Sequence, residues 1–186
     1  IMDGEARRMQ RLVDDLMSLS RIEAEKYRAP ETAIDLAELT AEVVGIFRSS
    51  HGTRGRDVEM ALAVPMATVQ GDRAQLSQLL HNLIGNAAKY GRPDTPIRVG
   101  LSDGPRGMLR LSVADEGEGI APDHLPRLTE RFYRVDSGRS RAMGGTGLGL
   151  AIVKHIVERH RGRLDIASTL GKGTTITVLV PIAEQG

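Results

Sequence analysis

Residues 143–153 read Met-Gly-Gly-Thr-Gly-Leu-Gly-Leu-Ala-Ile-Val, a glycine-rich run that passes straight into a helical pattern. Glycine lets backbone N–H groups crowd around an anion, and the first turn of a helix adds partial positive charge. Gly145, Gly147 and Gly149 lack the G-x-G-x-x-G spacing of a dinucleotide-binding turn, and the polar residues before them do not read as a strand. Taken alone, the run predicts either a phosphate-binding loop or a plain entry into a helix.

A second string, Gly171-Lys172-Gly173-Thr174, has part of the pattern of a P-loop. Ile166 stands where that motif needs its first glycine, and β-branched residues follow where a helix should begin. The P-loop fold is therefore excluded.

The composition suits a globular domain with an appendage, since 186 residues of which 40% are hydrophobic are enough for one packed core. The 25 basic and 24 acidic residues leave a net charge of +1, so nothing favours nucleic acid or an anionic membrane as an electrostatic partner. The absence of cysteine excludes disulfides and thiolate metal sites. No apolar run approaches the ~20 residues that span a bilayer, so we expect no direct membrane contact. Because the first residue is Ile1, we expect a fragment of a longer protein.

A narrow apolar stripe predicts one long helix over residues 3–27, with Met9, Leu12, Leu16, Leu19 and Ile22 at steps of three and four. A stripe this narrow favours packing against a partner helix in a dimeric bundle, and the alternative is docking on the domain that follows. Pro30 and its polar neighbours predict a short linker. The chain therefore divides into a leading helical segment, residues 1–29, and a domain, residues 30–186.

The rest of the chain alternates helical and strand patterns. Helices are expected near residues 36–47, 73–90 and 148–160, the second of them capped by Asp72. Strands are expected near residues 57–63, 67–70, 97–101, 108–114, 163–167 and 174–180. Residues 116–145 form a long loop with a short helical possibility at 122–128, and loops of that length are usually functional. This order predicts a two-layer α/β sandwich with helices on one face of a mixed sheet.

Three polar clusters accompany the glycine run. Asn82 and Asn86 lie four residues apart on the second of these helices and share a face, with Lys89 one turn further on. Asp115 follows directly on a buried strand and begins the string Asp-Glu-Gly-Glu-Gly-Ile. Residues 130–134, Glu-Arg-Phe-Tyr-Arg, place aromatic and basic side chains inside the long loop. The ordinary alternatives are a solvent-facing amide pair, a turn-forming aspartate and an anchored surface loop.

In this order and spacing, the four clusters resemble the N, first glycine, F and second glycine boxes of the catalytic domain of sensor histidine kinases. The resemblance covers about residues 35–181, and residues 9–23 resemble the second helix of that family's dimerisation and phosphoacceptor domain. It implies the Bergerat ATP-binding fold, which type II topoisomerases and mismatch-repair ATPases share. It also implies that residues 116–145 form a lid over the nucleotide.

The resemblance implies a role for each matching residue. Asp115 accepts a hydrogen bond from the exocyclic amine of adenine, and Thr174 assists through water. Asn86 ligates Mg²⁺ beside Asn82, while Lys89 and Arg134 meet the phosphates. Tyr90 packs by the base or ribose, and the backbone of the second glycine box holds the triphosphate. The residues implied to bind Mg-ATP are Asn82, Asn86, Lys89, Tyr90, Asp115, Gly117, Gly119, Ile120, Tyr133, Arg134, Gly145, Thr146, Gly147, Leu148, Gly149 and Thr174. Magnesium prefers oxygen ligands and keeps several waters, so one amide oxygen and phosphate oxygens suffice.

Asn82 separates phosphate transfer from hydrolysis within this superfamily. The ATP-hydrolysing relatives carry a glutamate at this position as general base, whereas an amide cannot take a proton. The resemblance therefore implies delivery of phosphate to a histidine, a reaction that depends on in-line geometry and charge stabilisation. Thr129 and Ile176 stand where the family often has aromatic residues, which implies looser packing of the lid.

The phosphoacceptor histidine is not recognisable in this chain. The family's acceptor is followed by an acidic-hydrophobic-basic-Ser/Thr-Pro signature, and that signature follows none of His51, His81, His124, His155 and His160. We therefore expect the acceptor to lie outside this chain.

The resemblance thus implies the catalytic part of a sensor histidine kinase of a two-component system. The parent protein would use ATP and Mg²⁺ to phosphorylate its own histidine and would pass the group to an aspartate of a response regulator. It would be a homodimer through its dimerisation helices, with this part in the cytoplasm. The alternative, from a different class, is a degenerate kinase that serves as a nucleotide-sensing or scaffolding module without catalysis.

Overall fold

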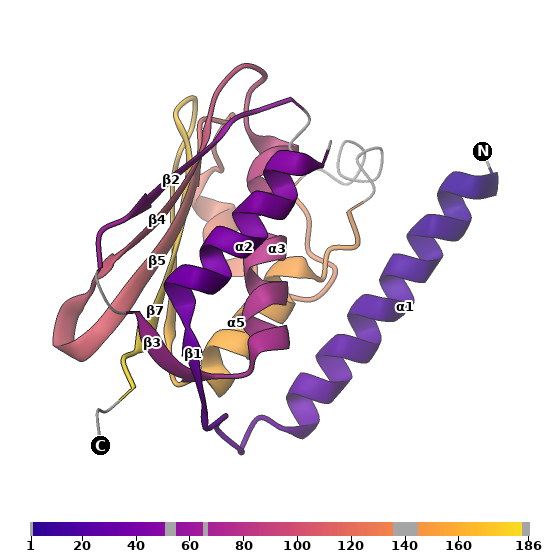
Figure 1. The fold of residues 1–186 in the computed structure, drawn as a ribbon. Helices are drawn as coiled ribbons and strands as arrows, with labels where there is room; N and C mark the ends of the chain where they lie inside the picture. Colours follow the sequence, from indigo (N-terminus) through magenta and orange to yellow (C-terminus); the bar gives the residue numbers. More distant parts are fainter. Residues whose placement is uncertain (1, 51–54, 65–66, 136–144, 184–186) are drawn as a thin grey trace.

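The computed structural model describes residues 2–50, 55–64, 67–135 and 145–183 of the chain. Figure 1 shows helices α2, α3 and α5 in one layer and the long strands in a second, with α1 standing to one side. The predicted two-layer α/β architecture with a leading helix is confirmed. The elements, in chain order, are α1 (Met2–Ala24), β1 (Thr32–Asp35), α2 (Leu36–Ser49), β2 (Val58–Leu62), β3 (Thr68–Gly71), α3 (Arg73–Tyr90), β4 (Ile97–Asp103), η2 (Pro105–Gly107), β5 (Met108–Asp115), η3 (Pro122–Arg127), α5 (Gly149–Arg159), β6 (Arg163–Thr169) and β7 (Gly173–Pro181).

The main sheet has the strand order β2-β4-β5-β7-β6. β2 runs parallel to β4 and the other neighbouring pairs are antiparallel, so the sheet is mixed, as predicted. Side chains alternate along each strand, and on β5 Leu109, Leu111 and Val113 are buried whereas Arg110 is exposed. The buried side chains of the sheet belong to the same core as those of the helices, so the apolar face of the sheet is turned toward the helix layer.

α3 carries the predicted amide cluster and packs at the centre of the helix layer. Asp72 caps its first turn, as predicted, because its side chain accepts a hydrogen bond from the Gln75 N–H. The inner face is fully buried from Leu76 to Ala88, and each buried leucine there contributes roughly 1.5–3 kcal/mol. This burial fixes the rotation of the helix about its axis, and so the direction in which Asn82 and Asn86 project.

A second, two-stranded sheet was missed by the sequence analysis. β1 pairs antiparallel with β3, although no strand was predicted for residues 32–35. The strand has only four residues and one buried side chain, Ile34, so it has too little alternation to be recognised. Its partner lies far along the chain, and that pairing becomes visible only in three dimensions. Asp35 at its end caps α2, accepting hydrogen bonds from the N–H groups of Ala37 and Glu38.

The two halves of α1 have different surroundings. In the C-terminal half, Leu19 and Ile22 are only 2% and 1% exposed and belong to the same core as α5. In the N-terminal half, Met9 is 66% exposed, and this half projects away from the body of the molecule (Figure 1). Docking on the following domain therefore accounts for half of the apolar stripe. Neither α1 nor any other described helix is long and apolar enough to cross a membrane.

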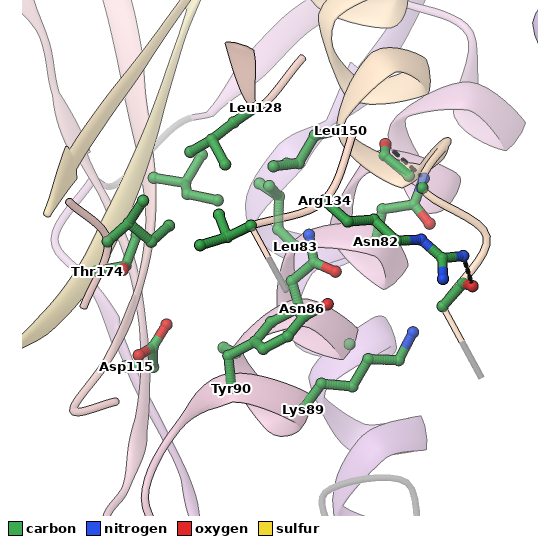
Figure 2. Close-up of a pocket in the computed structure, with 18 of the residues that line it drawn as sticks. Asn82, Leu83, Asn86, Lys89, Tyr90, Asp115, Leu128, Arg134, Leu150 and Thr174 are labelled. Atoms are coloured by element: carbon green, nitrogen blue, oxygen red, sulfur yellow. Dashed lines mark hydrogen bonds between the residues drawn. The ribbon is translucent and has the colours of Figure 1, made fainter. Parts of the chain in front are cut away.

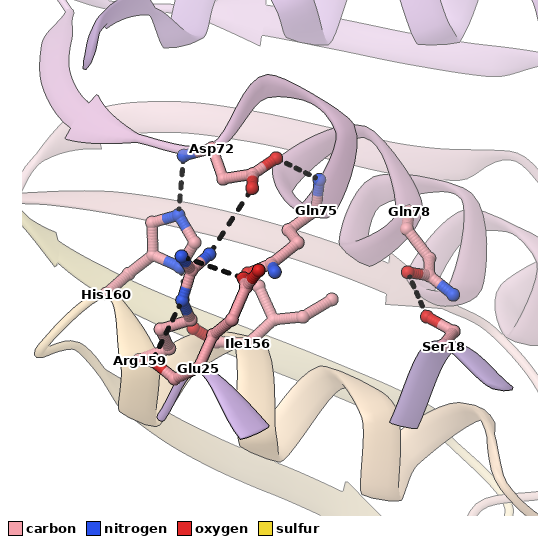
Figure 3. A network of polar contacts seen from close by, with 8 residues as sticks. All are labelled: Ser18, Glu25, Asp72, Gln75, Gln78, Ile156, Arg159 and His160. Carbon is pink, nitrogen blue, oxygen red and sulfur yellow. Dashed lines mark hydrogen bonds and ion pairs between the residues drawn. The ribbon is translucent and has the colours of Figure 1, made fainter. Parts of the chain in front are cut away.

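A polar network fastens the end of α1 to the helix layer (Figure 3). Arg159, only 7% exposed, forms ion pairs with Glu25 at 3.0 Å and with Asp72 at 3.3 Å. The Asp72 N–H donates to Nε2 of His160 at 3.0 Å, and Nδ1 of the same ring lies 2.7 Å from the Ile156 carbonyl oxygen. Burial lowers the pKa of His160, which keeps the ring neutral and Nε2 able to accept. The network thus joins the segment after α1, the start of α3 and the end of α5.

Candidate functional site

One pocket brings most of the predicted site residues together. It has a volume of about 390 Å³ and lies between α3, the ends of β5 and β7, and the start of α5. The predicted residues that line it are Asn82, Asn86, Lys89, Tyr90, Asp115, Gly119, Ile120, Tyr133, Arg134, Gly145, Thr146, Gly147, Gly149 and Thr174. Gly117 and Leu148 do not line it. The lining is completed by residues that were not predicted from the sequence, namely Arg11, Asp15, His81, Leu83, Gly85, Ala87, Val113, Glu118, Leu128, Val135, Leu150, Ile166 and Ile176.

Asp115 and Thr174 meet at the sheet side of the pocket because they are register partners on β5 and β7. The Gly117 N–H donates to Oδ1 of Asp115 at 2.8 Å, so Gly117 orients the carboxylate although it does not line the pocket. Burial raises the pKa of Asp115, while the hydrogen bonds from the backbone of Gly117 and Thr174 and the positive charge of Arg56 act in the opposite direction. This end of the pocket therefore offers a carboxylate in fixed orientation.

Ser168 on β6 supports this end of the pocket and was missed by the sequence analysis. Its hydroxyl accepts a hydrogen bond from the Ile120 N–H at 2.8 Å and lies 2.8 Å from the Thr174 hydroxyl. It thereby holds residues 117–120 against the sheet. Gly119 allows the close approach, because its φ is +72° and a Cβ there would lie 2.1 Å from the Thr169 carbonyl oxygen.

Apolar side chains separate the two ends of the pocket. Figure 2 shows Leu83, Leu128 and Leu150 between Asp115 and Thr174 on one side and Asn82 and Arg134 on the other. Val113, Ile166 and Ile176 add to this apolar wall. A slot with apolar walls and the oriented Asp115 carboxylate at its end fits a flat heteroaromatic ring that carries a hydrogen-bond donor.

The opposite end of the pocket carries amides and cations. Asn82 and Asn86 project from one face of α3, as predicted, and Lys89 extends past them (Figure 2). The Asn82 Nδ2 donates to the Gly149 carbonyl oxygen at 3.4 Å, which links α3 to the start of α5. Among the described residues, no group of three or more His, Cys, Asp or Glu side chains could hold a metal ion.

The glycine run closes this end of the pocket. Gly147 has φ +78°, and a Cβ there would lie 2.9 Å from Cα of Phe132, whose N–H donates to the Gly147 carbonyl oxygen at 2.9 Å. The Arg134 guanidinium donates to the Gly145 carbonyl oxygen. α5 begins at Gly149 without a capping side chain, so its first N–H groups and its dipole face the pocket. Leu148 is fully buried, and its side chain belongs to the core.

The predicted lid, residues 116–145, is described only in part, because residues 136–144 lie outside the described residues, as do Met143 and Gly144 of the glycine run. Within the described part, Tyr133 lines the pocket, and its hydroxyl is hydrogen-bonded to Nδ1 of His124. The Arg127 guanidinium lies 4.2 Å from the centroid of the Tyr133 ring. These contacts connect η3 to the pocket.

Arg56, before β2, caps the C-terminal end of α3 and was not identified from the sequence. Its guanidinium donates to the carbonyl oxygens of Ala87, Ala88 and Gly91 and, through Nε at 2.8 Å, to that of Arg92. The last carbonyls of a helix lack partners within the helix, and a cation also complements the helix dipole there. Arg56 therefore fixes the turn that carries Lys89 and Tyr90.

Replacing Arg56 by Met should lower the free energy of unfolding by about 2–3 kcal/mol, because hydrogen bonds from a charged donor to carbonyls of the helix end are lost. Arg110→Met, at an exposed position on β5, is the matched control and should change it by less than about 0.5 kcal/mol. Urea unfolding followed by circular dichroism measures both variants. Equal midpoints for the wild type and Arg56→Met would show that the guanidinium does not stabilise the helix end.

Comparison with known proteins places the chain in a family. The model for histidine kinase-, DNA gyrase B-, and HSP90-like ATPases matches residues 71–184. The chain is 43% identical over 176 residues to the phosphate regulon sensor protein PhoR of Pseudomonas aeruginosa, covering 95% of this chain and 39% of PhoR. It is 38% identical over 185 residues to the signal transduction histidine-protein kinase BaeS of Escherichia coli, covering 99% of this chain and 39% of BaeS. The chain thus spans about two fifths of the length of these relatives.

The fold agrees with that of solved histidine kinases. The structure of full-length ShkA in complex with AMPPNP superposes with a TM-score of 0.81 at 28% identity, covering 96% of this chain and 36% of that one. The mycobacterial sensor histidine kinase MprB gives a TM-score of 0.68 at 29% identity, covering 81% of this chain and 97% of that one. With most of its length matched by sequence and by structure, the chain belongs to the family of histidine kinase-, DNA gyrase B-, and HSP90-like ATPases.

Proposed function

We propose that this chain binds Mg-ATP in the described pocket and donates the γ-phosphoryl group to a histidine outside the chain. One observation carries the proposal. A carboxylate in fixed orientation, an apolar slot, two amides, two cations and an uncapped helix start line the same pocket, in the order in which adenine, ribose and triphosphate would need them. The parent protein is then a protein-histidine kinase of a two-component system.

Adenine would occupy the apolar slot and donate its exocyclic amine to the Asp115 carboxylate, with Thr174 assisting through water. Tyr90 would lie beside the base or the ribose. The triphosphate would extend toward Lys89, Arg134 and the backbone N–H groups at the start of α5. Cations and a helix dipole there stabilise the charge that spreads over the phosphoryl oxygens during transfer.

Magnesium fits the donors at this end of the pocket. Asn86 offers an amide oxygen, and the described residues supply no acidic cluster, so most ligands would be phosphate oxygens and waters. This agrees with the preference of Mg²⁺ for oxygen ligands and with its reluctance to lose water. The ion would neutralise charge on the bound phosphates, and Asn86 would orient it.

Asn82 supports transfer over hydrolysis. Its amide carries no titratable lone pair and its Nδ2 is directed at the Gly149 carbonyl oxygen, so it cannot activate water. His81 also lines the pocket, but its ring packs against Phe47 with centroids 5.3 Å apart and lies on α3 itself. The acceptor histidine is therefore proposed to come from another segment of the parent protein.

Residues 1–29 are proposed to be the trailing helix of the dimerisation and phosphoacceptor domain, and residues 30–186 the catalytic domain. The exposed apolar side chains of Met9, Val13, Leu16 and Met17 are available to pack against the other helices of a homodimeric bundle. After histidine phosphorylation, an aspartate of a response regulator would receive the group. The parent is expected to place this part in the cytoplasm.

Incubation of the chain with radiolabelled ATP tests the proposal. The chain alone should bind ATP, incorporate no acid-labile phosphate and release phosphate very slowly. Adding the dimerisation domain of the parent in trans should restore labelling of histidine, weakly, because loss of the tether removes an effective concentration of about millimolar order.

Three outcomes would change this conclusion. Labelling of the isolated chain on His81 or His155 would place the acceptor inside it, and rapid phosphate release would indicate a self-sufficient ATPase. Tight ATP binding without transfer to the added domain would favour the nucleotide-sensing or scaffolding alternative.

A further inference from the structure

Helix α1 reaches the nucleotide pocket from outside the catalytic domain. Arg11 and Asp15 line the same pocket as Asn86, Lys89 and Arg134. The Thr146 hydroxyl in the glycine run donates a hydrogen bond to Oδ2 of Asp15 at 2.6 Å. An anionic side chain therefore lies at the end of the pocket where the amides, the cations and the start of α5 gather.

The same Thr146 hydroxyl also occupies a backbone donor of the glycine run. It accepts a hydrogen bond from the Leu148 N–H at 3.3 Å. An ionised carboxylate can only accept, so Asp15 takes the hydroxyl proton and leaves the lone pairs of Thr146 turned toward Leu148. In this arrangement the Leu148 N–H is directed at Thr146 and not at a ligand.

Several contacts hold α1 in this position. Leu19 and Ile22 are buried, the Ser18 hydroxyl donates to Oε1 of Gln78 at 2.8 Å, and Glu23 pairs with the Arg131 guanidinium. The ion pair of Glu25 with Arg159 fastens the segment that follows the helix (Figure 3). Asp15 lies three to ten residues before these anchors, so its place at the pocket follows from the docking of the whole helix.

We propose that Asp15 competes with the phosphates of the nucleotide for Thr146 and the Leu148 N–H, so that docking of α1 selectively weakens binding of the triphosphate. The inference rests on the proposed function, because it assumes that this end of the pocket receives phosphates. A carboxylate at the phosphate site repels the ligand and also withholds a donor from it. By linkage, ATP and docked α1 oppose each other to the same extent.

The test compares Asp15→Ala with Asp14→Ala. Asp14 is the matched control, because it carries the same charge on the same helix but accepts its hydrogen bond from Gln10 and does not line the pocket. Affinities for ATP, ADP and adenosine are measured by calorimetry, and thermal unfolding verifies that each variant is folded.

Asp15→Ala should bind ATP about tenfold more tightly than the wild type, which is within the usual range of coupling between sites. For the same variant, the increase in affinity for ADP should be smaller, and adenosine should bind to it as tightly as to the wild type. Asp14→Ala should bind all three ligands as the wild type does. Asp15→Asn, which keeps an acceptor and loses the charge, should show part of the gain.

Failure of this inference can be told apart from failure of the proposed function. If the wild type binds ATP and Asp15→Ala binds it equally or less tightly, the competition is refuted and the proposed function stands. If the Asp15→Ala variant binds ATP and the wild type does not, the competition is supported in its strongest form. If neither protein binds ATP or adenosine, both the inference and the proposed function are overturned. An equal gain for adenosine would also overturn the inference, because it would show an effect that does not depend on phosphate.

Discussion

ATP should bind this chain roughly a thousandfold more tightly than GTP, and Asp115→Asn should abolish most of that preference. Sites built to hydrogen-bond one group reject an analogue that cannot make the bond by as much as ~10⁴-fold. Guanine would place a carbonyl oxygen against the Asp115 carboxylate, and two acceptors would face each other. The preference therefore depends on one carboxylate oxygen that lies in the pocket.

The asparagine variant should favour the other base because the orientation of its side chain is fixed. The Gly117 N–H needs an acceptor, so the amide oxygen of the substituted side chain would take the place of Oδ1 and its NH₂ group would face the ligand. That group clashes with the adenine amine and can donate to the guanine carbonyl. The affinity for ATP should fall by about 10- to 100-fold, as expected when a hydrogen bond to a charged group is lost, and the affinity for GTP should rise. Calorimetric titration of both nucleotides measures this, with Asp103→Asn at the end of β4 as control. An unchanged ATP-to-GTP ratio in Asp115→Asn would disprove the assignment.

The raised pKa of Asp115 adds a pH dependence with a definite sign. The adenine amine is best accepted by the ionised carboxylate, so ATP affinity should fall as the pH drops through that pKa, at a higher pH than an ordinary aspartate would give. Asp115→Asn should lack this fall, and it provides the reference at each pH. Parallel profiles for the two proteins would mean that another group titrates.

The contribution of Asp115 to the stability of the nucleotide-free protein should depend on pH in the opposite direction to ATP affinity, because it should increase as the pH falls. A carboxyl group whose pKa is higher in the folded chain favours folding at low pH, and this contribution is lost as the pH rises through the folded pKa. At a pH above the folded pKa the buried, ionised Asp115 therefore opposes folding, and there Asp115→Asn should unfold at a higher temperature than the wild type in the absence of nucleotide. The difference should shrink as the pH falls from the raised folded pKa to the usual aspartate value. A variant that is both less stable and weaker in binding would indicate that Asp115 is mainly structural.

Asn86→Ala should weaken ATP binding in the presence of Mg²⁺ by about 10- to 100-fold and should affect ADP without metal much less. Asn86 is the only described amide that we propose as a magnesium ligand, and losing a polar contact to a charged group typically changes affinity by this factor. Competition with Mn²⁺, whose paramagnetism broadens ligand resonances, reports the metal without any activity measurement. Ser77→Ala, another polar-to-alanine change on α3, should leave both affinities unchanged. Equal losses for Mg-ATP and metal-free ADP would assign Asn86 a structural role in its helix.

Local patterns were enough to predict the helices and strands that carry most of the pocket. The leucine spacing of α3 and the Asp72 cap fixed the direction of Asn82 and Asn86, and strand alternation located Asp115 at the end of β5. The prediction that the pocket binds ATP came from the resemblance to the sensor histidine kinases. What local patterns lack is pairing between distant segments, such as Asp115 with Thr174 or the short strand of residues 32–35 with β3.

The missed site residues share the same cause. Arg56 lies in a connection before a strand, and nothing in its neighbourhood indicates that it reaches four carbonyls of residues 87–92. Asp15 reads as one more polar residue on an amphipathic helix, and its contact with Thr146 spans 131 positions. Ser168 looks like an ordinary strand residue until β6 lies beside β7. Each acts through tertiary contacts that have no signature in the order of residues.

The strand order also determines when the pocket can exist. β7 is the latest of the five strands in the chain, yet it lies between β5 and β6, and it brings Thr174 to Asp115. During synthesis the edge of β5 stays unpaired until residues 173–181 have left the ribosome, and exposed edges of this kind invite association with other chains. A nascent chain is therefore expected to gain affinity for ATP in a single late step. ATP binding by the nascent chain would then indicate that β7 has paired with β5 and β6.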